Sequence, residues 1–283
     1  MLEKILRYLH TLRSLQRVNM SLARGGAGRS GRNVDPAQPP TWEFAGFSQN
    51  GEDGIIEVVL SHLRSPNRYF VEIGASDGLE NNTTWLALVR RYGGLWIEGD
   101  PDASKKCRDL FASLNYGVEI ASMFATLETA PAIVAKAREK NPDLLSIDID
   151  GNDYYIADAL FKAGLKPKIC VVEFNSAFGP ELSVTVPYVS DFRVRSGAGE
   201  NLYYGCSLQG WKKFFERSGY EFITVDANGV NAFFAHPDAM VPGFLERVEP
   251  RNFAENTSQL REYGSGWEKQ LAMIDVARLH KIV

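Results

Sequence analysis

The sequence has few of the residues that mark disulfide-stabilised or zinc-binding proteins. It contains only three cysteines and four histidines in 283 residues, and Cys107, Cys170 and Cys206 are far apart. An odd number of scattered cysteines without a metal-ligand spacing argues against a disulfide framework and a zinc ribbon. We therefore expect a reduced, cytoplasmic chain whose thiols are buried.

Excess positive charge is also missing. Lys and Arg number 31 against 35 Asp and Glu, so the net charge is -4. A protein that coats nucleic acid needs a surplus of cations that neutralise phosphates, so nucleic acid is not an expected partner. With 45% hydrophobic residues, the chain has the composition of an ordinary globular protein with one main domain.

No apolar run at the N-terminus is long enough to span a membrane, but residues 1–23 form an amphipathic pattern. The apolar residues at helical spacing are Leu2, Ile5, Leu6, Leu9, Leu12 and Leu15, and the basic residues between them are Lys4, Arg7, Arg13 and Arg17. Such a basic helix lies on an acidic membrane at the inner face, contacts a partner protein or second copy, or packs on its own domain.

Glycine, proline and arginine dominate residues 24–40, which predicts a flexible linker after this helix. We place the folded domain at residues 41–240 and expect residues 241–283 to form a helical extension.

Within the domain, predicted helices and strands alternate. The predicted strands are 69–73, 94–98, 117–121, 144–149 and 168–174, and helices precede and separate them. Two later strands, 220–225 and 231–235, flank an Asn-Gly turn typical of a hairpin. This order predicts an α/β fold of the class I methyltransferase (Rossmann-like) type, a mostly parallel sheet with helices on both faces and an antiparallel edge.

The segment Tyr69-Phe-Val-Glu-Ile-Gly-Ala-Ser-Asp-Gly78 is typical of a strand that turns sharply into a helix beside a nucleotide. It lacks the Gly-x-Gly-x-x-Gly pattern that brings backbone against a pyrophosphate. A cofactor without phosphates fits better, and S-adenosylmethionine has a sulfonium charge that Glu72 can face. The alternative is an ordinary tight turn of an α/β protein.

Acidic residues follow several predicted strands, where α/β sheets bind their ligands. Glu98 ends the second strand and is the expected partner of the ribose hydroxyls. Asp100 competes for that role, or caps the next helix ahead of Pro101. Ser122 and Met123, after the third strand, are expected at the adenine edge.

The fourth predicted strand ends in Asp148-Ile-Asp150-Gly-Asn-Asp153, with three carboxylates within six residues. A divalent cation would offset their repulsion, and oxygen ligands from Asp150, Glu173 and Asn175 suit magnesium, calcium or manganese. Asp153 or Asp148 is then the candidate proton acceptor. Without a metal, Asp148 and Asp150 would bind acceptor hydroxyls and backbone amides instead.

Taken together, several blocks resemble FkbM-type S-adenosylmethionine-dependent methyltransferases. They are Ser48-Gln-Asn-Gly-Glu-Asp-Gly54, Phe70-Val-Glu-Ile-Gly-Ala-Ser-Asp-Gly78, Asn82-Thr83, Trp96-Ile-Glu-Gly-Asp-Pro101, Leu145-Ser-Ile-Asp-Ile-Asp-Gly-Asn-Asp153, Val171-Val-Glu-Phe-Asn175, Tyr204-Gly-Cys-Ser-Leu208 and Asn231-Ala-Phe-Phe234. The resemblance covers roughly residues 45–236 and implies an O-methyltransferase that acts on a sugar hydroxyl of a glycan or glycosylated product. It implies that the cofactor contacts are Glu72, Gly74, Ser76, Asp77, Gly78, Asn82, Thr83 and Glu98, with Gln49 and Glu52 closing over the methionine end.

The fourth strand is also similar to that of metal-dependent sugar O-methyltransferases, which carry an Asp-Gly-x-His block there. Here the block is Asp150-Gly-Asn-Asp153, so the metal position matches and the base position does not.

The acceptor region and the function class have open alternatives. Aromatic residues after the fifth strand are expected to stack on a sugar or to fill the core: Tyr188, Phe192, Tyr203, Tyr204 and Trp211. An NAD-dependent nucleotide-sugar oxidoreductase and a non-catalytic cofactor-binding module in glycan assembly are the alternative functions.

Overall fold

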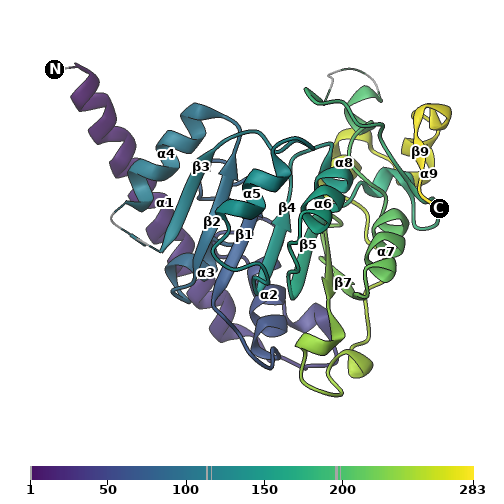
Figure 1. Cartoon of the computed structure of the whole chain (residues 1–283), viewed down its shortest axis with the longest axis horizontal. Coiled ribbons are helices and arrows are strands. Elements are labelled where there is room, and N and C mark those ends of the chain that lie inside the picture. The colour runs from purple at the N-terminus through teal and green to yellow at the C-terminus, as the bar shows by residue number, and fades with distance from the viewer. Residues whose placement is uncertain (1, 113, 116, 195–196, 198) are drawn as a thin grey trace.

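A computed structural model describes the chain except residues 1, 113, 116, 195, 196 and 198, with side chains from residue 12 onward. A seven-stranded sheet forms its centre (Figure 1). Its strands, in spatial order, are β3 (Val118–Ser122), β2 (Gly93–Glu98), β1 (Tyr69–Ile73), β4 (Leu144–Ile147), β5 (Ile169–Glu173), β8 (Asn231–Ala235) and β7 (Glu221–Val225).

The first five strands run parallel, while β8 is antiparallel to β5 and to β7. The order 3-2-1-4-5 with an antiparallel pair at the edge is the class I methyltransferase arrangement. The predicted fold class is confirmed, and the predicted strands agree with the observed ones to within about two residues.

Two layers of helices cover the sheet because its central strands are apolar on both faces. One face carries α2 (Glu52–Ser61), α3 (Thr84–Leu88) and α4 (Pro101–Phe111), and its core includes Phe70 and Trp96. The other carries α5 (Ala130–Lys136), α6 (Asp153–Lys162) and α7 (Leu208–Arg217), with Val71 and Trp211 in its core. The short 3-10 helices are η1 (Pro39–Thr41), η2 (Ser176–Phe178), η3 (Glu200–Leu202), η4 (Pro237–Ala239), η5 (Leu245–Arg247) and η6 (Val276–Arg278).

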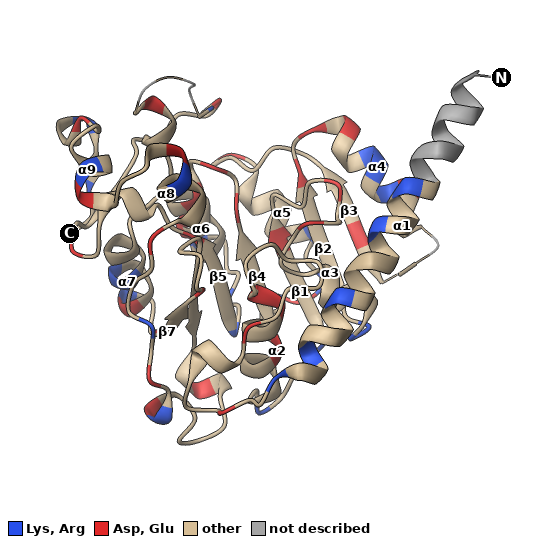
Figure 2. Ribbon diagram, turned by 180° about the vertical axis from the view of Figure 1, so that it is seen from behind, with Lys and Arg blue, Asp and Glu red and all other residues tan. Residues whose placement is uncertain are grey.

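The first helix, α1 (Leu2–Gly31), is longer than predicted, because residues 24–31 continue it instead of forming a linker. Its glycines permit close packing: a Cβ at Gly25 would overlap the Trp85 ring, and one at Gly28 would lie 3.0 Å from Phe44. Arg29 also forms an ion pair of 2.6 Å with Glu57 of α2. Tertiary contacts therefore hold a glycine-rich segment helical, against its weak intrinsic propensity. Basic residues recur along the part of α1 that follows residue 12 (Figure 2).

The C-terminal segment is less helical than predicted. Only α8 (Thr257–Tyr263) and α9 (Trp267–Leu271) are α-helices, because Pro242, Gly243 and Pro250 interrupt the earlier part. A short strand, β9 (His280–Lys281), pairs antiparallel with β6 (Val184–Thr185). These pieces pack with residues 177–192 and 202–203 around a third apolar cluster. They form a side lobe on the β7 side of the sheet (Figure 1).

Two sequence expectations concern the chain as a whole. Cys107, Cys170 and Cys206 are unpaired and buried, as expected. Among the described residues, no helix combines the length and apolar character that crossing a bilayer requires.

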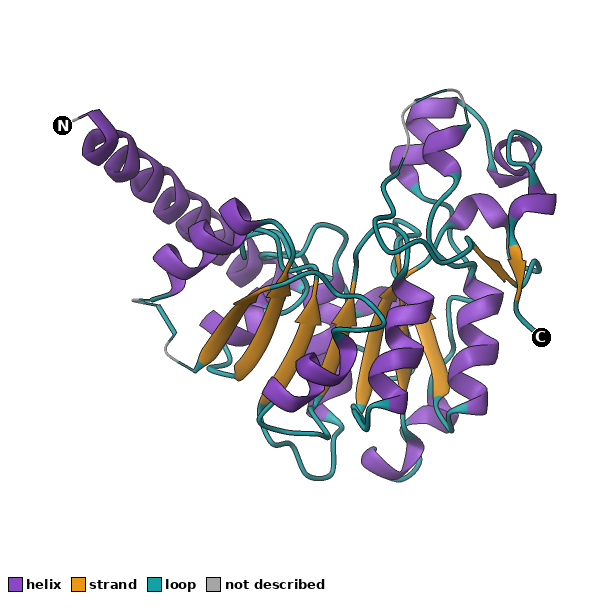
Figure 3. Cartoon of the chain, turned by 45° about the horizontal axis from the view of Figure 1, so that its top comes forward, coloured by secondary structure: helices purple, strands orange, loops and turns teal. Residues whose placement is uncertain are grey.

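Figure 3 shows the parallel strands ending on one side, where the connecting loops and the side lobe gather.

Candidate active site

A cavity of about 270 Å³ lies at the carboxyl ends of β1 to β4, and we call it the inner cavity. Ser76 and Glu98 line one part of it, and Asp148 and Asp150 line another. Met123 is also in its wall, while the neighbouring Ser122 is exposed and outside it. A cavity therefore lies at the predicted strand ends, and of the two residues expected at the adenine edge Met123 lines it.

Glu98 holds the loop that follows β1. Its carboxylate accepts hydrogen bonds from the backbone N–H of Ser76 (2.6 Å) and of Asp100 (2.7 Å). A carboxylate has about four lone-pair sites, so it retains capacity for ribose hydroxyl donors. Asp100 instead caps α4 by accepting from Asp102 and Ala103, and it does not line the cavity, so its predicted alternative role as a cap is the observed one.

Gly74 is the residue that brings the β1 and β4 loops together. Its φ of 91° lies in the left-handed region, and a Cβ would overlap the carbonyl oxygen of Asp148. Only glycine satisfies both constraints without strain. Gly74 and Asp148 consequently line both the inner cavity and a smaller one behind it.

The smaller cavity, of about 70 Å³, is named here the acidic cavity. Its described lining includes no Lys or Arg but four carboxylates, those of Glu52, Glu72, Glu80 and Asp148. The predicted residues Gln49 and Asn82 also line it, together with Asn231. This acidic lining is suited to a positively charged group, the role that the sequence suggests for Glu72.

Glu72 has a structural role as well. Its carboxylate accepts hydrogen bonds from the Asn82 backbone N–H (2.9 Å) and from the Thr83 hydroxyl. Burial raises its pKa to about 7, against the opposing effect of these donors. Thr83 is fully buried and lines neither cavity, so its predicted cofactor contact becomes support for Glu72.

Two other predicted cofactor residues lie outside both cavities. Asp77 forms an ion pair of 2.7 Å with Arg17 of α1, and Gly78, with φ of 77°, packs against Cys107 and Phe111. Both belong to the turn after β1, which presents Gly74 and Ser76 to the inner cavity.

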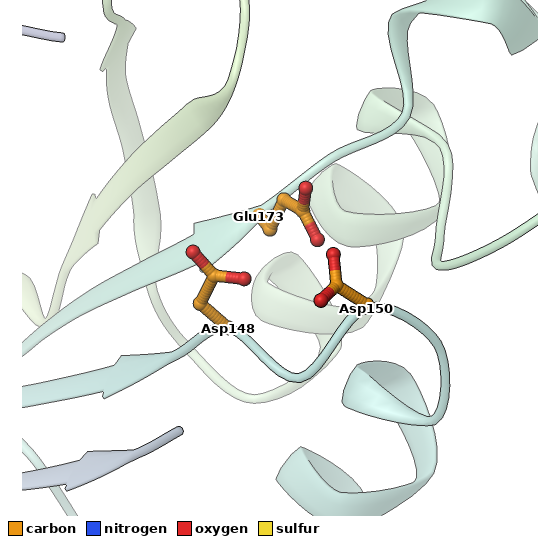
Figure 4. A group of neighbouring side chains, drawn as sticks. All are labelled: Asp148, Asp150 and Glu173. Carbon is orange, nitrogen blue, oxygen red and sulfur yellow. The ribbon is translucent and has the colours of Figure 1, made fainter. Parts of the chain in front are cut away.

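Three carboxylates converge at the ends of β4 and β5 (Figure 4). Asp148, Asp150 and Glu173 each place one oxygen within 4.8 Å of the others. Burial, reinforced by their neighbours' charge, raises the pKa of Asp148 and of Glu173 well above the ordinary carboxyl range. Asp150 adopts a left-handed φ of 54°, and its pKa is raised by burial.

One further observation supports a divalent cation at this cluster. Glu173 Oε2 is buried and has no hydrogen-bond partner among the described residues, which is costly for a carboxylate oxygen unless a cation or proton meets it. An all-oxygen set suits magnesium, calcium or manganese. Asp148, Asp150 and Glu173 are the residues that would hold it.

Asn175 is not part of this set, which corrects the sequence prediction. Its side-chain N–H groups donate to the carbonyl oxygens of Leu202 (2.7 Å) and Tyr204 (3.1 Å), and its Oδ1 accepts from Ala177. All of its polar atoms are thus engaged in holding the 202–204 turn against the end of β5. The sequence cannot distinguish the two roles, because an asparagine after a strand can be a metal ligand or can bind backbone groups.

Asp153 does not fit the proton-acceptor role that the sequence suggested. It is fully buried at the start of α6, and its two oxygens accept from the backbone N–H of Ile149 (2.9 Å) and Gly151 (2.8 Å). Burial raises its pKa to about 6, although both hydrogen bonds favour the ionised form. Asp153 therefore braces the loop that carries Asp148 and Asp150, and Asp148 remains the proton-acceptor candidate.

Sequence reasoning missed part of the cavity wall. Arg193 lines the inner cavity beside Phe192, and its guanidinium lies 5.3 Å from the Phe124 ring centre. Among the aromatic candidates, Phe192 and Tyr203 line cavities, while Tyr204 and Trp211 are buried. Arg193 follows an irregular segment without periodicity, so no sequence signal marks it.

No family model matches the sequence, and no curated protein is similar to it. Among solved structures, an O-methyltransferase from Bacillus cereus in complex with SAH is 17% identical, with 77% of this chain and 89% of that one covered and a TM-score of 0.43. The O-methyltransferase TomG from Streptomyces achromogenes is 15% identical, over 76% and 95% of the chains, with a TM-score of 0.43. A putative O-methyltransferase from Klebsiella pneumoniae is 16% identical, over 77% and 87%, with a TM-score of 0.41. These likenesses are too distant to bear on the activity.

Proposed function

We propose that the protein is an S-adenosylmethionine-dependent O-methyltransferase whose acceptor is a sugar hydroxyl. The observation that carries this proposal is the shared wall of the two cavities. Gly74 and Asp148 join an acidic cavity, suited to the positive end of the cofactor, to an inner cavity with Glu98 at the ribose position. The acidic cluster lies beside the same junction, where an acceptor hydroxyl would meet the methyl group.

The residues hold the cofactor by charge and hydrogen bonding instead of by phosphate contacts. Glu98 accepts from the ribose hydroxyls, while Glu52 and Glu72 surround the amino end of the methionine part. S-adenosylmethionine supplies a methyl group on a positively charged sulfur. This distribution of acids matches a ligand that has positive charge and no phosphate.

The chain aligns the acceptor and removes its proton. As the new C–O bond forms and the S–C bond breaks, the hydroxyl proton passes to a carboxylate, for which Asp148 is the candidate because it borders both cavities. Asp148 can take this proton where it does not itself hold a cation, since a metal-bound carboxylate is a weaker base. A divalent cation on the cluster would supply stabilisation of the alkoxide. Gly74 and Glu98 contribute by fixing the geometry of the displacement.

Calorimetric titration with S-adenosylhomocysteine, with magnesium and then with chelator, tests the cofactor half. We expect micromolar binding, about -8 kcal/mol. Asp150→Asn should retain that binding and lose methyl transfer to sugar acceptors at least a hundredfold, because the cluster loses a charged ligand. Lack of binding in both conditions contradicts the proposal, and normal turnover of Asp150→Asn contradicts the metal-assisted form. NAD titrated in the same way tests the oxidoreductase alternative.

A further inference from the structure

A third cavity, of about 340 Å³, adjoins the inner cavity and shares Phe192 and Arg193 with it. We call it the outer cavity. Tyr203, Glu200 and Arg278 form its far wall, and Arg278 comes from the C-terminal segment. Its volume falls within the range of pockets that hold small organic ligands, roughly 300–1,000 Å³, so the outer cavity has room for one separate group.

The first wall of the outer cavity is fixed to the loop of the acidic cluster. The side-chain N–H of Asn152 donates to the Val189 carbonyl (2.7 Å), and the Val189 N–H donates back to Asn152 Oδ1 (3.4 Å). The Phe192 ring lies on Gly151, where a Cβ would overlap it. Residues 187–193 therefore keep a set position relative to Asp150.

The opposite wall is fixed to the end of β5 in the same way. Asn175 donates to the carbonyl oxygens of Leu202 and Tyr204, on either side of Tyr203. Each wall is thus attached through an asparagine amide to a segment that carries an acid of the cluster, the loop after β4 in one case and the end of β5 in the other. A group bound between the two walls therefore has a fixed position relative to the acidic cluster.

The lining of the outer cavity is polar, balanced in charge and partly aromatic. Arg278 pairs with Glu200 at 3.3 Å, and its guanidinium lies 4.3 Å from the Tyr203 ring centre. Asp191 and Arg193 add one charge of each sign. Balanced donors and acceptors around aromatic rings suit an uncharged ring with several hydroxyl groups, whereas a phosphate or carboxylate would require a cationic surplus.

We propose that the outer cavity binds the second sugar ring of the acceptor, so the substrate is a glycoside of two or more rings instead of a free monosaccharide. This inference rests on the proposed function. In it, the ring that is methylated lies at the Asp150 end of the inner cavity, beside the part that Glu98 lines for the cofactor, and Phe192 lies between the two rings. Arg278 and Tyr203 are specificity-determining residues that touch only the second ring.

The test measures methyl transfer from radiolabelled S-adenosylmethionine to neutral hexose monosaccharides and to disaccharides that end in the same hexoses. We expect kcat/KM to be at least about tenfold higher for the disaccharides, as one charge-assisted hydrogen bond would provide. Arg278→Ala should raise KM for the disaccharide about tenfold and leave the monosaccharide reaction unchanged. Tyr203→Ser serves as the second variant, and Arg261→Ala, on α8 and outside the cavity, is the matched control.

The outcomes separate the two proposals. Equal kcat/KM for a monosaccharide and its disaccharide, or an Arg278→Ala variant with unchanged KM, overturns the second-ring site and leaves the proposed function in place. If S-adenosylhomocysteine binds but no sugar is methylated, the sugar acceptor and the second-ring site are both wrong. S-adenosylhomocysteine affinity measured for each variant distinguishes loss of acceptor binding from loss of the fold.

Discussion

Asn231 has a buried amide oxygen without a hydrogen-bond partner among the described residues, although the residue is only 2% exposed. Its orientation is determined by Glu52, because the amide N–H donates to Glu52 Oε1 at 2.8 Å. Both residues line the acidic cavity. An oxygen in this position can accept from an ammonium group, which would complete its hydrogen bonding.

We predict that Asn231→Ala weakens discrimination for the α-amino group of the cofactor. Wild-type protein should bind S-adenosylhomocysteine at least about tenfold more tightly than the analogue that lacks the amino group, and the variant should lose most of that ratio. Calorimetry with both ligands measures it. Asn228→Ala, in the hairpin turn that precedes β8 and outside the cavity lining, is the control. An unchanged ratio in Asn231→Ala would show that the amide does not receive the amino group.

Asp53 provides a prediction on pH. It is 1% exposed, and burial raises its pKa from 3.8 to about 7, although Oδ2 accepts backbone N–H bonds from Gly46, Phe47 and Ser48. Between pH 4 and pH 7 the folded protein retains a proton that the unfolded chain has released, so this group lowers stability as pH rises through that window.

Asp53→Asn mimics the protonated carboxyl and removes this dependence. The free energy of unfolding of the wild type, relative to the variant, should fall by up to about 4 kcal/mol between pH 4 and pH 7 and stay level above. Urea denaturation of both proteins across the range measures the difference. A constant difference would mean that Asp53 is ionised in the folded state throughout.

At this scale, the sequence predicts acids better than it predicts their roles. Asp148, Asp150 and Glu173 could be placed together because the carboxyl ends of parallel strands meet at one edge. The roles of Asp153 and Asn175 could not, because side-chain oxygens after a strand bind backbone amides as readily as ligands. Which of these occurs depends on loops such as 202–204, whose positions follow from tertiary packing.

Among the elements, α1 shows most clearly how tertiary contacts override local composition. Residues 24–31 are glycine- and arginine-rich, yet they form the last turns of a helix packed on Trp85 and Phe44. The small β6–β9 pair was likewise beyond sequence reasoning, because two-residue strands have no periodicity. The longer strands and helices were predictable, because each buries a periodic apolar pattern.

Two adjacent glycines of α1 give a matched test of this packing. Gly25→Ala should destabilise the protein by about 1–3 kcal/mol, because the new methyl group overlaps Trp85. Gly26→Ala meets no atom within 4 Å and should stabilise it by up to about 1 kcal/mol through helix propensity. Chemical denaturation measures both. Equal effects of the two substitutions would contradict close packing of α1 on the domain.

On the scale of the whole molecule, α1 contacts the loop that follows β1, residues 74–80, which we call the cofactor loop. Arg17 forms ion pairs with Asp77 (2.7 Å) and Glu80 (3.0 Å), which belong to the segment after β1. Glu80 lines the acidic cavity, and Ser76 next to Asp77 lines the inner one. The position of the N-terminal helix and the order of the cofactor loop therefore depend on one another.

We predict that Arg17→Ala lowers the affinity for S-adenosylhomocysteine by up to about fivefold, since partly exposed ion pairs contribute roughly 0.2–1 kcal/mol. The free energy of unfolding should change by no more than about 1 kcal/mol. Arg13→Ala, an exposed arginine on the same helix, is the control. If both variants bind the ligand equally, α1 is structurally separate from the cofactor site.

The hydrogen bonds of Asn152 and Asn175, which hold the two walls of the outer cavity, also affect how the acceptor specificity of such a protein can change in evolution. Residues 187–193 and 202–204 reach the acid-bearing segments through the amides of Asn152 and Asn175. Because backbone carbonyls accept these bonds, side chains in both wall segments can be exchanged during evolution without moving the carboxylates. A lineage that keeps the two asparagines is thus free to acquire new acceptors while its chemistry is inherited unchanged.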